Sequence, residues 1–458
     1  MVTHVESRSA VNLDCFYLST TNEYFCEGKL NASLQEEDAV TFTGNHVSGY
    51  SDDDVKYFFN NQRFVFQRIP SEVFAKFRNL QVFDLNAADL SSISSESFKN
   101  CAKLEEIDLD DNKIVKVSPQ SFISCSSLTT ISLRKNVIPG IEKGIFKGVE
   151  RLENLDLSQN RIAELTDEIF SPLNALKQLK MSKNIIRKIH ARAFDSLKTL
   201  ELLDLSENFI ESLDSTVFIN CKALLTLKLS KNLIKTLNDQ VFQFQKNLKS
   251  IDLSENQLGR LSARTFRELE ALKMFIVNKA MITGVEANLF NDKANLTKLD
   301  FRGNICIDKQ FDNNDDIEIV KQGLQVCFDN FKKAFCKYSI NDEGFYICEL
   351  SANFLINETS IDYEVSGDHI DLKSDQDVQV IHSTNSQIDS IPEEISKKFP
   401  RIEKLSLWNV GLNDLNENNF DSFSNLKSLD LRLNQIASVE NESFPIPLDI
   451  EILILVKT

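Results

Sequence analysis

The sequence has little of what catalytic, metal-binding and membrane-spanning proteins use. It holds five histidines and one tryptophan in 458 residues. It contains no nucleophile motif, phosphate-binding loop, C-x-x-C pair or His-x-x-x-His pair, so we predict no enzyme activity, no catalytic residues, no metal site and no cofactor. It also has no run of about 18 apolar residues, which excludes a membrane-crossing helix within it.

Positive charge is also scarce. The chain has 51 Lys and Arg against 68 Asp and Glu, a net charge of -17. A chain this acidic repels phosphate backbones and anionic membranes. We therefore predict that it neither binds nucleic acid nor inserts into a membrane. No apolar stretch near Met1 resembles a signal peptide. We read Met1 as following a removed signal, with a cytosolic repeat protein as the alternative.

The sequence does contain a pattern that returns every 24 residues. The register L-x-x-L-x-L-x-x-N-x-I opens ten consecutive units, at Leu80, Leu104, Leu128, Leu152, Leu176, Leu200, Leu224, Leu248, Leu272 and Leu296. Alternating apolar residues predict a short strand in each unit, and the Asn predicts a ladder of turn hydrogen bonds. A Phe at position 19 predicts stacked rings on the outer side. Such units must stack on one another, which predicts a curved solenoid.

The nine cysteines separate into two groups in this register. Six lie outside the regular units and pair by proximity, which predicts the disulfides Cys15–Cys26, Cys306–Cys327 and Cys336–Cys348. Cys101, Cys125 and Cys221 instead hold a packing slot three residues before an opening Leu. We expect buried free thiols there, although a Cys101–Cys125 bridge between adjacent units is geometrically feasible.

Four sequons, at Asn31, Asn295, Asn357 and Asn441, indicate the same oxidising, secretory origin as the predicted disulfides. Each is an N-x-S/T glycosylation acceptor of the kind found in secreted proteins. Together the two features predict a disulfide-bonded glycoprotein that is secreted or displayed as a cell-surface ectodomain.

After Cys327 the opening architecture starts again. Tyr24-Phe-Cys26 returns as Tyr346-Ile-Cys348, and the offset between equivalent residues stays at 321 to 323. The histidines His46 and His369, one in each cap, are expected to be hydrogen-bonding residues of a turn. We predict an N-terminal cap with irregular first units, ten regular units, a C-terminal cap, a second N-terminal cap and a second array, at 1–66, 67–305, 306–335, 336–377 and 378–458. Because the second array stops mid-unit, we expect a fragment of a longer polypeptide.

The repeat resembles the 24-residue typical subfamily of extracellular leucine-rich repeat proteins, over about residues 70–305 and 378–458. The run Gly303-Asn-Ile-Cys306 followed by Cys327-Phe328 resembles caps of insect leucine-rich repeat proteins. The chain is broadly similar to Toll-like receptor ectodomains and to secreted mosquito immune proteins. It departs from both, because Toll-type caps usually carry four cysteines and the mosquito proteins carry a coiled coil, whereas each cap here has two cysteines and no heptads appear. The resemblance implies an α/β-type horseshoe with a concave parallel β-sheet, irregular or 3-10 convex turns and disulfide-closed caps.

The resemblance also implies a function. It points to a non-enzymatic protein-binding module of insect innate immunity or of a receptor ectodomain, with a protein or glycan partner. The alternatives are an extracellular structural or adhesion spacer and an inhibitor or effector that wraps a target protein. Homodimers and heterodimers both stay open.

Candidate binding residues are those that depart from a charge ladder on the concave face. Signs alternate at position 5 from Asp156 to Asp252, so the middle of the sheet is expected to neutralise itself. An acidic cluster is formed by Asp84, Glu106, Asp108, Asp110 and Asp111, whose repulsion Arg134 and Lys135 on the next strand can offset. The alternative hypothesis is that the cluster binds a basic ligand or a divalent ion. In the ninth unit an apolar contact patch is predicted at Met274, Ile276 and Ala280. Trp408 is expected to face out of the second sheet, as an interface anchor or as a cover for Ile452 and Ile454.

Overall fold

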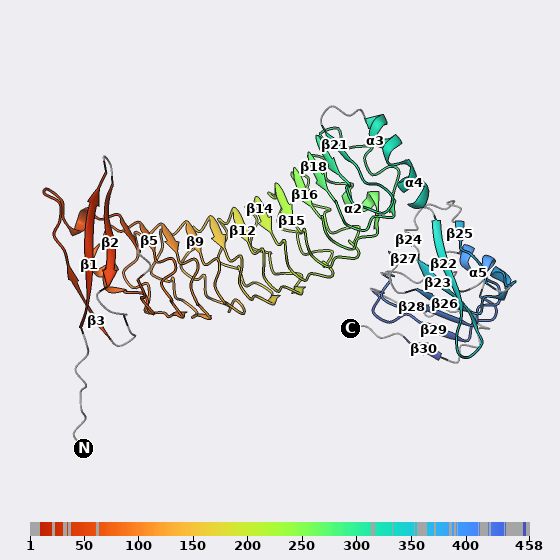
Figure 1. The fold of residues 1–458 in the computed structure, drawn as a ribbon, viewed down its shortest axis with the longest axis horizontal. Coiled ribbons are helices and arrows are strands. Elements are labelled where there is room, and N and C mark those ends of the chain that lie inside the picture. The colour runs from red at the N-terminus through yellow and green to blue at the C-terminus, as the bar shows by residue number, and fades with distance from the viewer. Residues whose placement is uncertain are drawn as a thin grey trace, which may run out of the picture.

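Two large sheets and two hydrophobic cores organise the described part of the chain, and the larger sheet follows one side of a curved solenoid (Figure 1). The computed structural model describes residues 10–20, 23–30, 34, 38–60, 64–312, 317–331, 333–351, 353–354, 364–370, 372–383, 387–388, 391, 393–410, 412, 420, 423–434, 436 and 452–454. Within these residues no helix is long and apolar enough to span a bilayer.

Ten parallel strands, one from each regular unit, form the middle of a 15-stranded sheet. Adjacent strands pair with an offset of 24 residues, as in Leu155 opposite Leu179. The ten strands are β5 (Val82–Asp84), β7 (Glu106–Asp108), β9 (Thr130–Ser132), β10 (Asn154–Asp156), β12 (Gln178–Lys180), β14 (Leu202–Asp204), β15 (Thr226–Lys228), β16 (Ser250–Asp252), β18 (Met274–Ile276) and β20 (Lys298–Asp300). The predicted register is therefore confirmed strand by strand.

The far side of each unit is built from turns, with few regular elements. Two short helices lie there, α1 (Glu72–Lys76) and α2 (Ala263–Phe266). Pairs of two-residue strands also form, β6 (Ser92–Ile93) with β8 (Lys116–Val117), β11 (Glu164–Leu165) with β13 (Lys188–Ile189), and β17 (Arg260–Leu261) with β19 (Gly284–Val285). The described 3-10 helices, η1 (Asp52–Asp54) and η2 (Asp375–Asp377), belong to the caps.

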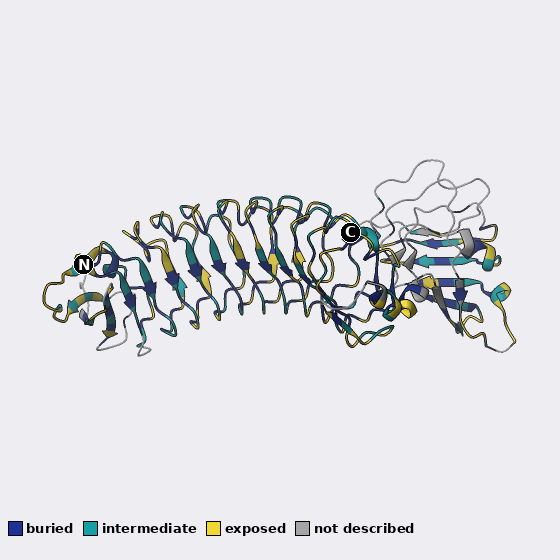
Figure 2. Cartoon of the chain, turned by 90° about the horizontal axis from the view of Figure 1, so that it is seen from above, coloured by how far each residue is buried: buried dark blue, intermediate teal, exposed yellow. Residues whose placement is uncertain are grey.

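Buried residues recur along the whole first array (Figure 2), and side chains of two kinds tie neighbouring units together. The predicted Phe stack is present: the ring centres of Phe170 and Phe194, and those of Phe194 and Phe218, lie 6.1 Å apart, and the rings are nearly parallel. The predicted Asn ladder is present too. Asn208 donates to the carbonyls of Leu205 and of Met181 one unit earlier, both at 3.0 Å. Each unit therefore has its backbone satisfied by its neighbour.

The ladder is interrupted at Ala88 and Ala280, which stand in the Asn slot and are buried. In both cases position 12 of the preceding unit adopts a left-handed backbone, with φ of 47° at Gln67 and 63° at Gly259. A tight turn is centred on each, as in the 2.6 Å bond from the Arg260 N–H to the Leu258 carbonyl. Each gap in the ladder thus coincides with a tight turn in the unit before it.

Position 8 of the units has a left-handed backbone throughout the regular array. Its φ lies between 49° and 57° at Ala87, Asp111, Lys135, Gln159, Lys183, Glu207, Lys231, Glu255 and Lys279, and the last unit has Gly303 there at 67°. A non-glycine residue in this conformation costs about 1 kcal/mol. The ladder bonds of the next residue hold the turn in place against that cost.

The N-terminal cap extends the large sheet by four strands, β1 (Ala10–Ser19), β2 (Tyr24–Leu30), β3 (Ala39–Thr43) and β4 (Tyr57–Phe59). The Cys15–Cys26 disulfide joins β1 to β2. His46 binds the Tyr24 hydroxyl at 3.1 Å and Asp52 at 3.0 Å, and Asp52 binds Lys76 at 2.9 Å. His46 is thus the hydrogen-bonding turn residue that was predicted.

The other end of the first array is covered by β21 (Gln310–Asp312), α3 (Ile317–Gly323) and α4 (Gln325–Phe331). α4 packs on β19, and Cys327 of α4 is bonded to Cys306. Both cap disulfides of the first array were correctly predicted.

The Cys101–Cys125 pair corrects the prediction of free thiols. These residues form a disulfide with a Cα–Cα distance of 4.8 Å. A slot shared by adjacent units is a packing slot, but it also brings two cysteines within bridging distance. Cys221 has no cysteine in the neighbouring slots and is a buried free thiol, as predicted. Burial raises the pKa of that thiol to about 12.

The second sheet repeats the plan of the first. Its seven strands are β25 (Glu364–Ser366), β22 (Lys333–Ile340), β23 (Tyr346–Ser351), β26 (Val380–Ser383), β28 (Lys404–Leu407), β29 (Ser428–Asp430) and β30 (Ile452–Ile454). β24 (Asn353–Phe354), β27 (Gln387–Ile388) and α5 (Glu393–Lys398) complete the described elements. The Cys336–Cys348 disulfide links β22 to β23 as predicted.

The duplication extends to individual contacts. His369 binds the Tyr346 hydroxyl at 3.0 Å and Asp375 at 3.1 Å, and Lys398 binds Asp375 at 3.0 Å, as their counterparts do in the first cap. Gly44 and Gly367 occupy equivalent turns, where a Cβ would collide with the carbonyl of Cys15 or Cys336. The five-segment division of the chain remains our prediction.

The structure describes one of the four predicted glycosylation sites. Asn295 is exposed, and its side-chain nitrogen donates to the Glu270 carbonyl at 3.1 Å. Asn31, Asn357 and Asn441 lie outside the described residues.

Candidate binding surface on the concave sheet

The strands present every second residue to solvent. Position 4 of each unit is buried in the core, while positions 3 and 5 are at least partly exposed in nine of the ten strands. The exception is β20, where Asp300 at position 5 is buried. The aspartates at position 5 also have a local role. Each accepts the N–H of position 7, as in the 2.9 Å bond from Ser158 to Asp156 and the 3.0 Å bond from Ser206 to Asp204. These carboxylates therefore stabilise the turn as well as charge the surface.

The middle of the concave face pairs its charges across strands. Lys183 and Lys231 lie 3.5 Å and 3.9 Å from the two carboxylate oxygens of Glu207. Lys228 lies 3.6 Å from Asp204. The predicted self-neutralisation is confirmed for these contacts, which leaves little uncompensated charge for a ligand.

The acidic cluster near the N-terminal cap is held together by hydrogen bonds. Asn86 donates to Asp108 at 3.1 Å, and the Asp110 N–H donates to both Asn86 at 2.7 Å and Asp108 at 3.1 Å. The Oδ1 atom of Asp110 accepts from the Ser132 hydroxyl at 2.6 Å and from the Arg134 N–H at 2.8 Å. The neighbours Asn86 and Ser132 were missed by the sequence analysis, because only charged residues were considered.

The predicted counter-charges lie at the edge of this cluster. Lys135 is 3.3 Å from Asp111, and Arg134 reaches to 3.9 Å from Asp110. Burial, followed by the charge of Asp108, nevertheless raises the pKa of Asp84 and Asp110, that of Asp110 to about 6. Asp84, Glu106 and Asp108 are in no ion pair among the described residues, so the cluster keeps a surplus of negative charge.

Replacing Asp110 with asparagine is expected to stabilise the chain by about 1 kcal/mol at pH 7. A pKa raised from 3.8 to about 6 corresponds to about 3 kcal/mol, which solvent screening of a partly exposed group reduces. Asparagine keeps an oxygen for Ser132 and Arg134, as Asn86 does for Asp110. The charged carboxylate disfavours folding fully above the folded pKa of about 6, and this penalty is lost as the pH falls toward the unfolded pKa of 3.8. The difference in stability between Asp110→Asn and the parent should therefore vanish near pH 4.

Urea denaturation of both proteins at the two pH values tests this prediction. Glu106→Gln removes the same charge from an exposed position and should change stability by less than about 0.5 kcal/mol. Equal stability of Asp110→Asn and the parent at both pH values would show that Asp110 carries no electrostatic strain.

The divalent-ion hypothesis finds no support in this geometry. Among the described residues, no group of three or more His, Cys, Asp or Glu side chains is arranged to hold a metal. A basic polypeptide, which brings several cations to a broad surface, fits the cluster better.

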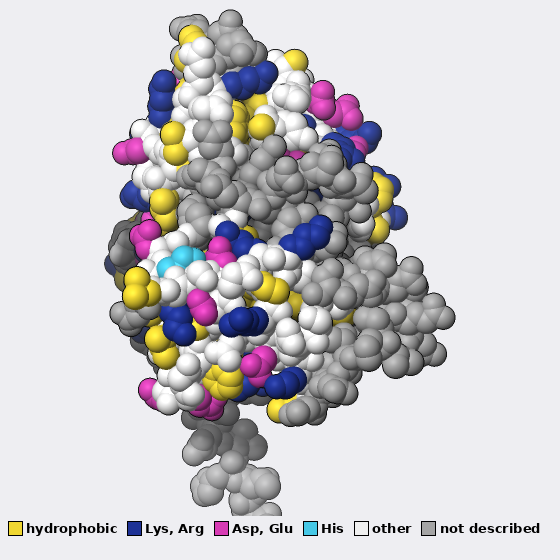
Figure 3. Space-filling model, turned by 90° about the vertical axis from the view of Figure 1, so that its right-hand side faces the viewer, with side chains coloured by type: hydrophobic (Ala, Val, Ile, Leu, Met, Phe, Trp, Pro, Cys, Tyr) yellow, Lys and Arg dark blue, Asp and Glu magenta, His cyan; other side chains and the backbone are white. Residues whose placement is uncertain are grey.

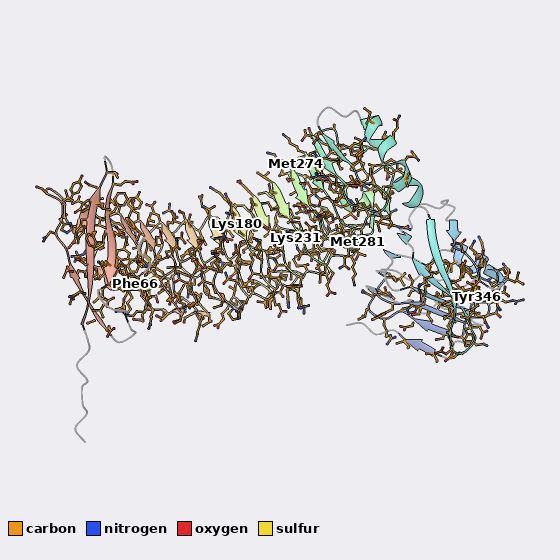
Figure 4. All side chains as sticks on the ribbon, in the orientation of Figure 1. Phe66, Lys180, Lys231, Met274, Met281 and Tyr346 are labelled. Atoms are coloured by element: carbon orange, nitrogen blue, oxygen red, sulfur yellow. A yellow bond between two sulfur atoms is a disulfide. The ribbon has the colours of Figure 1, made fainter. Side chains whose placement is uncertain are left out.

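The ninth unit presents apolar residues, with one correction. Met274 and Ile276 of β18 are partly exposed on the concave face, as predicted. Ala280 is buried, because it stands in the inward-facing Asn slot. Met281, which follows it, is exposed, and both methionines are marked in Figure 4. That Met274 and Ile276 form a contact patch remains a prediction.

In the second sheet Trp408 directly follows β28 and is exposed, as is Ile452 of β30. β29 separates their two strands. Beside the second cap a polar depression of about 470 Å³ is lined by Lys373, Asp377, Gln379, Arg401, Glu403, Asn425 and Lys427. Basic and acidic side chains are interspersed over this end of the molecule (Figure 3). Lys427 is bound to Glu403 at 3.0 Å, so the depression does not concentrate one sign of charge.

Comparisons with known proteins agree on the repeat. A model described as a BspA type leucine rich repeat region matches residues 61–176 in six copies, and one described as a leucine rich repeat matches 150–208, 198–258, 226–279 and 246–305. No curated protein matches. A solved leucine-rich repeat protein of Leptospira interrogans is 22% identical, with 82% of this chain and 84% of that chain covered and a TM-score of 0.48.

Proposed function

The chain belongs to the leucine-rich repeat family, and on that premise we propose that it is an extracellular, non-enzymatic recognition module that binds a protein partner. The observation that carries this proposal is the surplus of negative charge in the acidic cluster on the concave sheet. Asp84 lies on β5, Glu106 and Asp108 lie on the adjacent β7, and Asp110 and Asp111 follow β7 directly. Burial and mutual repulsion raise the pKa of Asp84 and Asp110.

A basic protein surface would relieve that repulsion on binding. Charge complementarity of this kind gives specificity and speeds association. The hydroxyls of a neutral glycan could donate hydrogen bonds to these carboxylates but would not neutralise their charge, so a basic protein is the better partner. The four disulfides support an oxidising, extracellular setting. Our proposal includes an innate-immune or receptor role in an insect, supported by the resemblance of the repeat and cap sequences.

The proposal is tested by affinity capture from extracellular fluid with purified full chain. The variant Glu106→Gln/Asp111→Asn removes two exposed charges of the cluster and should lose at least tenfold of the captured protein. The control Glu142→Gln/Glu211→Gln removes two exposed acids outside the cluster and should capture as the parent does. Identical capture by both variants would exclude the acidic cluster as the binding surface.

A structural spacer is the second candidate, and the neutralised middle of the sheet favours it. The contacts of Glu207 with Lys183 and Lys231 rigidify the surface without leaving charge for a partner. A spacer should capture no protein above background with the parent chain or with either variant.

A further inference from the structure

A row of exposed apolar side chains follows one edge of the first array, outside the concave face. Ile185, Phe209 and Leu233 occupy position 10 of three consecutive units. Ile185 is 43% exposed and Phe209 39%, and Leu233 is partly exposed. We call these three residues the lateral ridge.

The backbone keeps the lateral ridge in register. The N–H groups of Ile185, Phe209 and Leu233 each donate to the position-11 carbonyl of the preceding unit, at 3.1, 2.9 and 2.9 Å. The three side chains therefore follow one another at the spacing of the units, which is about 4.8 Å at the strands and 6.1 Å between the Phe rings on the outer side. Large apolar residues at such a spacing on a soluble surface mark a contact site.

Cations surround the ridge, in contrast to the acidic chain as a whole. Arg161 holds the same position one unit before Ile185, and Arg187 and Lys235 lie two residues beyond Ile185 and Leu233. None of the three has an ion-pair partner within 4.0 Å among the described residues. The Arg187 guanidinium lies 5.1 Å from the centre of the Phe209 ring. Glu211 is the one acid at position 12 between them.

We propose that the lateral ridge binds an amphipathic helix of another protein that bears acidic residues beside its apolar stripe. Side chains one turn apart on a helix are separated by about 5.4 Å along its axis, close to the spacing of the ridge. Alternate side chains of an extended strand are about 6.8 Å apart and would lose register. Acidic flanks would pair with Arg161, Arg187 and Lys235, none of which is in an ion pair with another described residue. This site is separate from the acidic cluster, and either can fail without the other.

The probe is a fluorescent 18-residue helical peptide with leucines at i, i+4, i+7 and i+11 flanked by glutamates, titrated with the full chain and followed by anisotropy. Ile185→Ser/Phe209→Ser should weaken binding by at least about tenfold, since it removes two large apolar contacts. The control Val115→Ser/Ile123→Ser removes two equally exposed apolar side chains elsewhere and should leave binding unchanged. A peptide with lysines in place of the glutamates should bind at least tenfold more weakly.

Two outcomes would overturn the proposal. Equal affinity of the ridge variant and the control variant would show that the peptide binds elsewhere. A concentration-dependent dimer in sedimentation velocity that is abolished by Ile185→Ser/Phe209→Ser would show that the ridge belongs to a contact between two copies of the chain. Unchanged circular dichroism and thermal unfolding of the variants confirm that neither result comes from misfolding.

Discussion

Replacing Asn208 with alanine is expected to lower the free energy of unfolding by about 3–5 kcal/mol. Its side-chain nitrogen donates to the carbonyls of Met181 and Leu205 at 3.0 Å, and its oxygen accepts the Ile186 N–H at 3.0 Å. Alanine would leave these buried backbone groups without partners, and each such group costs about 1–3 kcal/mol. Urea denaturation of the full chain, followed by circular dichroism, measures the loss.

The two natural alanines in this slot do not predict tolerance at Asn208. Before Ala280, the preceding unit has Gly259 in the left-handed conformation that closes the altered turn. The corresponding residue before Asn208 is Arg187, and for a non-glycine residue that conformation, which Gln67 adopts before Ala88, costs about 1 kcal/mol. Asn154→Ala, on the exposed concave face, is the control and should cost less than about 0.5 kcal/mol. A loss below about 1 kcal/mol for Asn208→Ala would mean that the turn rearranges without a glycine.

Removing the Cys101–Cys125 disulfide is expected to cost about 3 kcal/mol. The bridge closes a loop with a sequence separation of 24 residues, which restricts the unfolded chain. The test is thermal and urea unfolding of Cys101→Ala/Cys125→Ala. Cys221→Ala is a matched control, because Cys221 fills the same packing slot without a bridge. If the double variant loses no more than twice what Cys221→Ala loses, the bridge adds nothing beyond packing.

The sequence predicted the parts of the fold that follow from strict periodicity. Position 4 of each unit lies in the core, Asn160 bonds the turns, and Phe170 stacks between its neighbours, all as the 24-residue register requires. The cap disulfides followed from cysteines placed outside the register. These features depend on which slot a residue occupies, and slots can be counted in a sequence.

Features that depend on contacts between slots were not predicted. The bridge between Cys101 and Cys125 required knowing that a packing slot is also within disulfide reach. The turn-capping role of Asp156 required the direction of the Ser158 N–H. The lateral ridge did leave a signal, since Ile185, Phe209 and Leu233 share position 10 in adjacent units. That signal was missed because only concave positions were considered.

The Asn ladder also has a direction. Each asparagine completes the backbone of the unit that precedes it, as Asn232 does for Ile210 at 3.0 Å. A newly synthesised unit therefore still lacks part of its hydrogen bonding when it leaves the ribosome, and acquires it only when the next unit emerges. Native structure should advance along the nascent chain one unit behind synthesis, from the N-terminal cap onward.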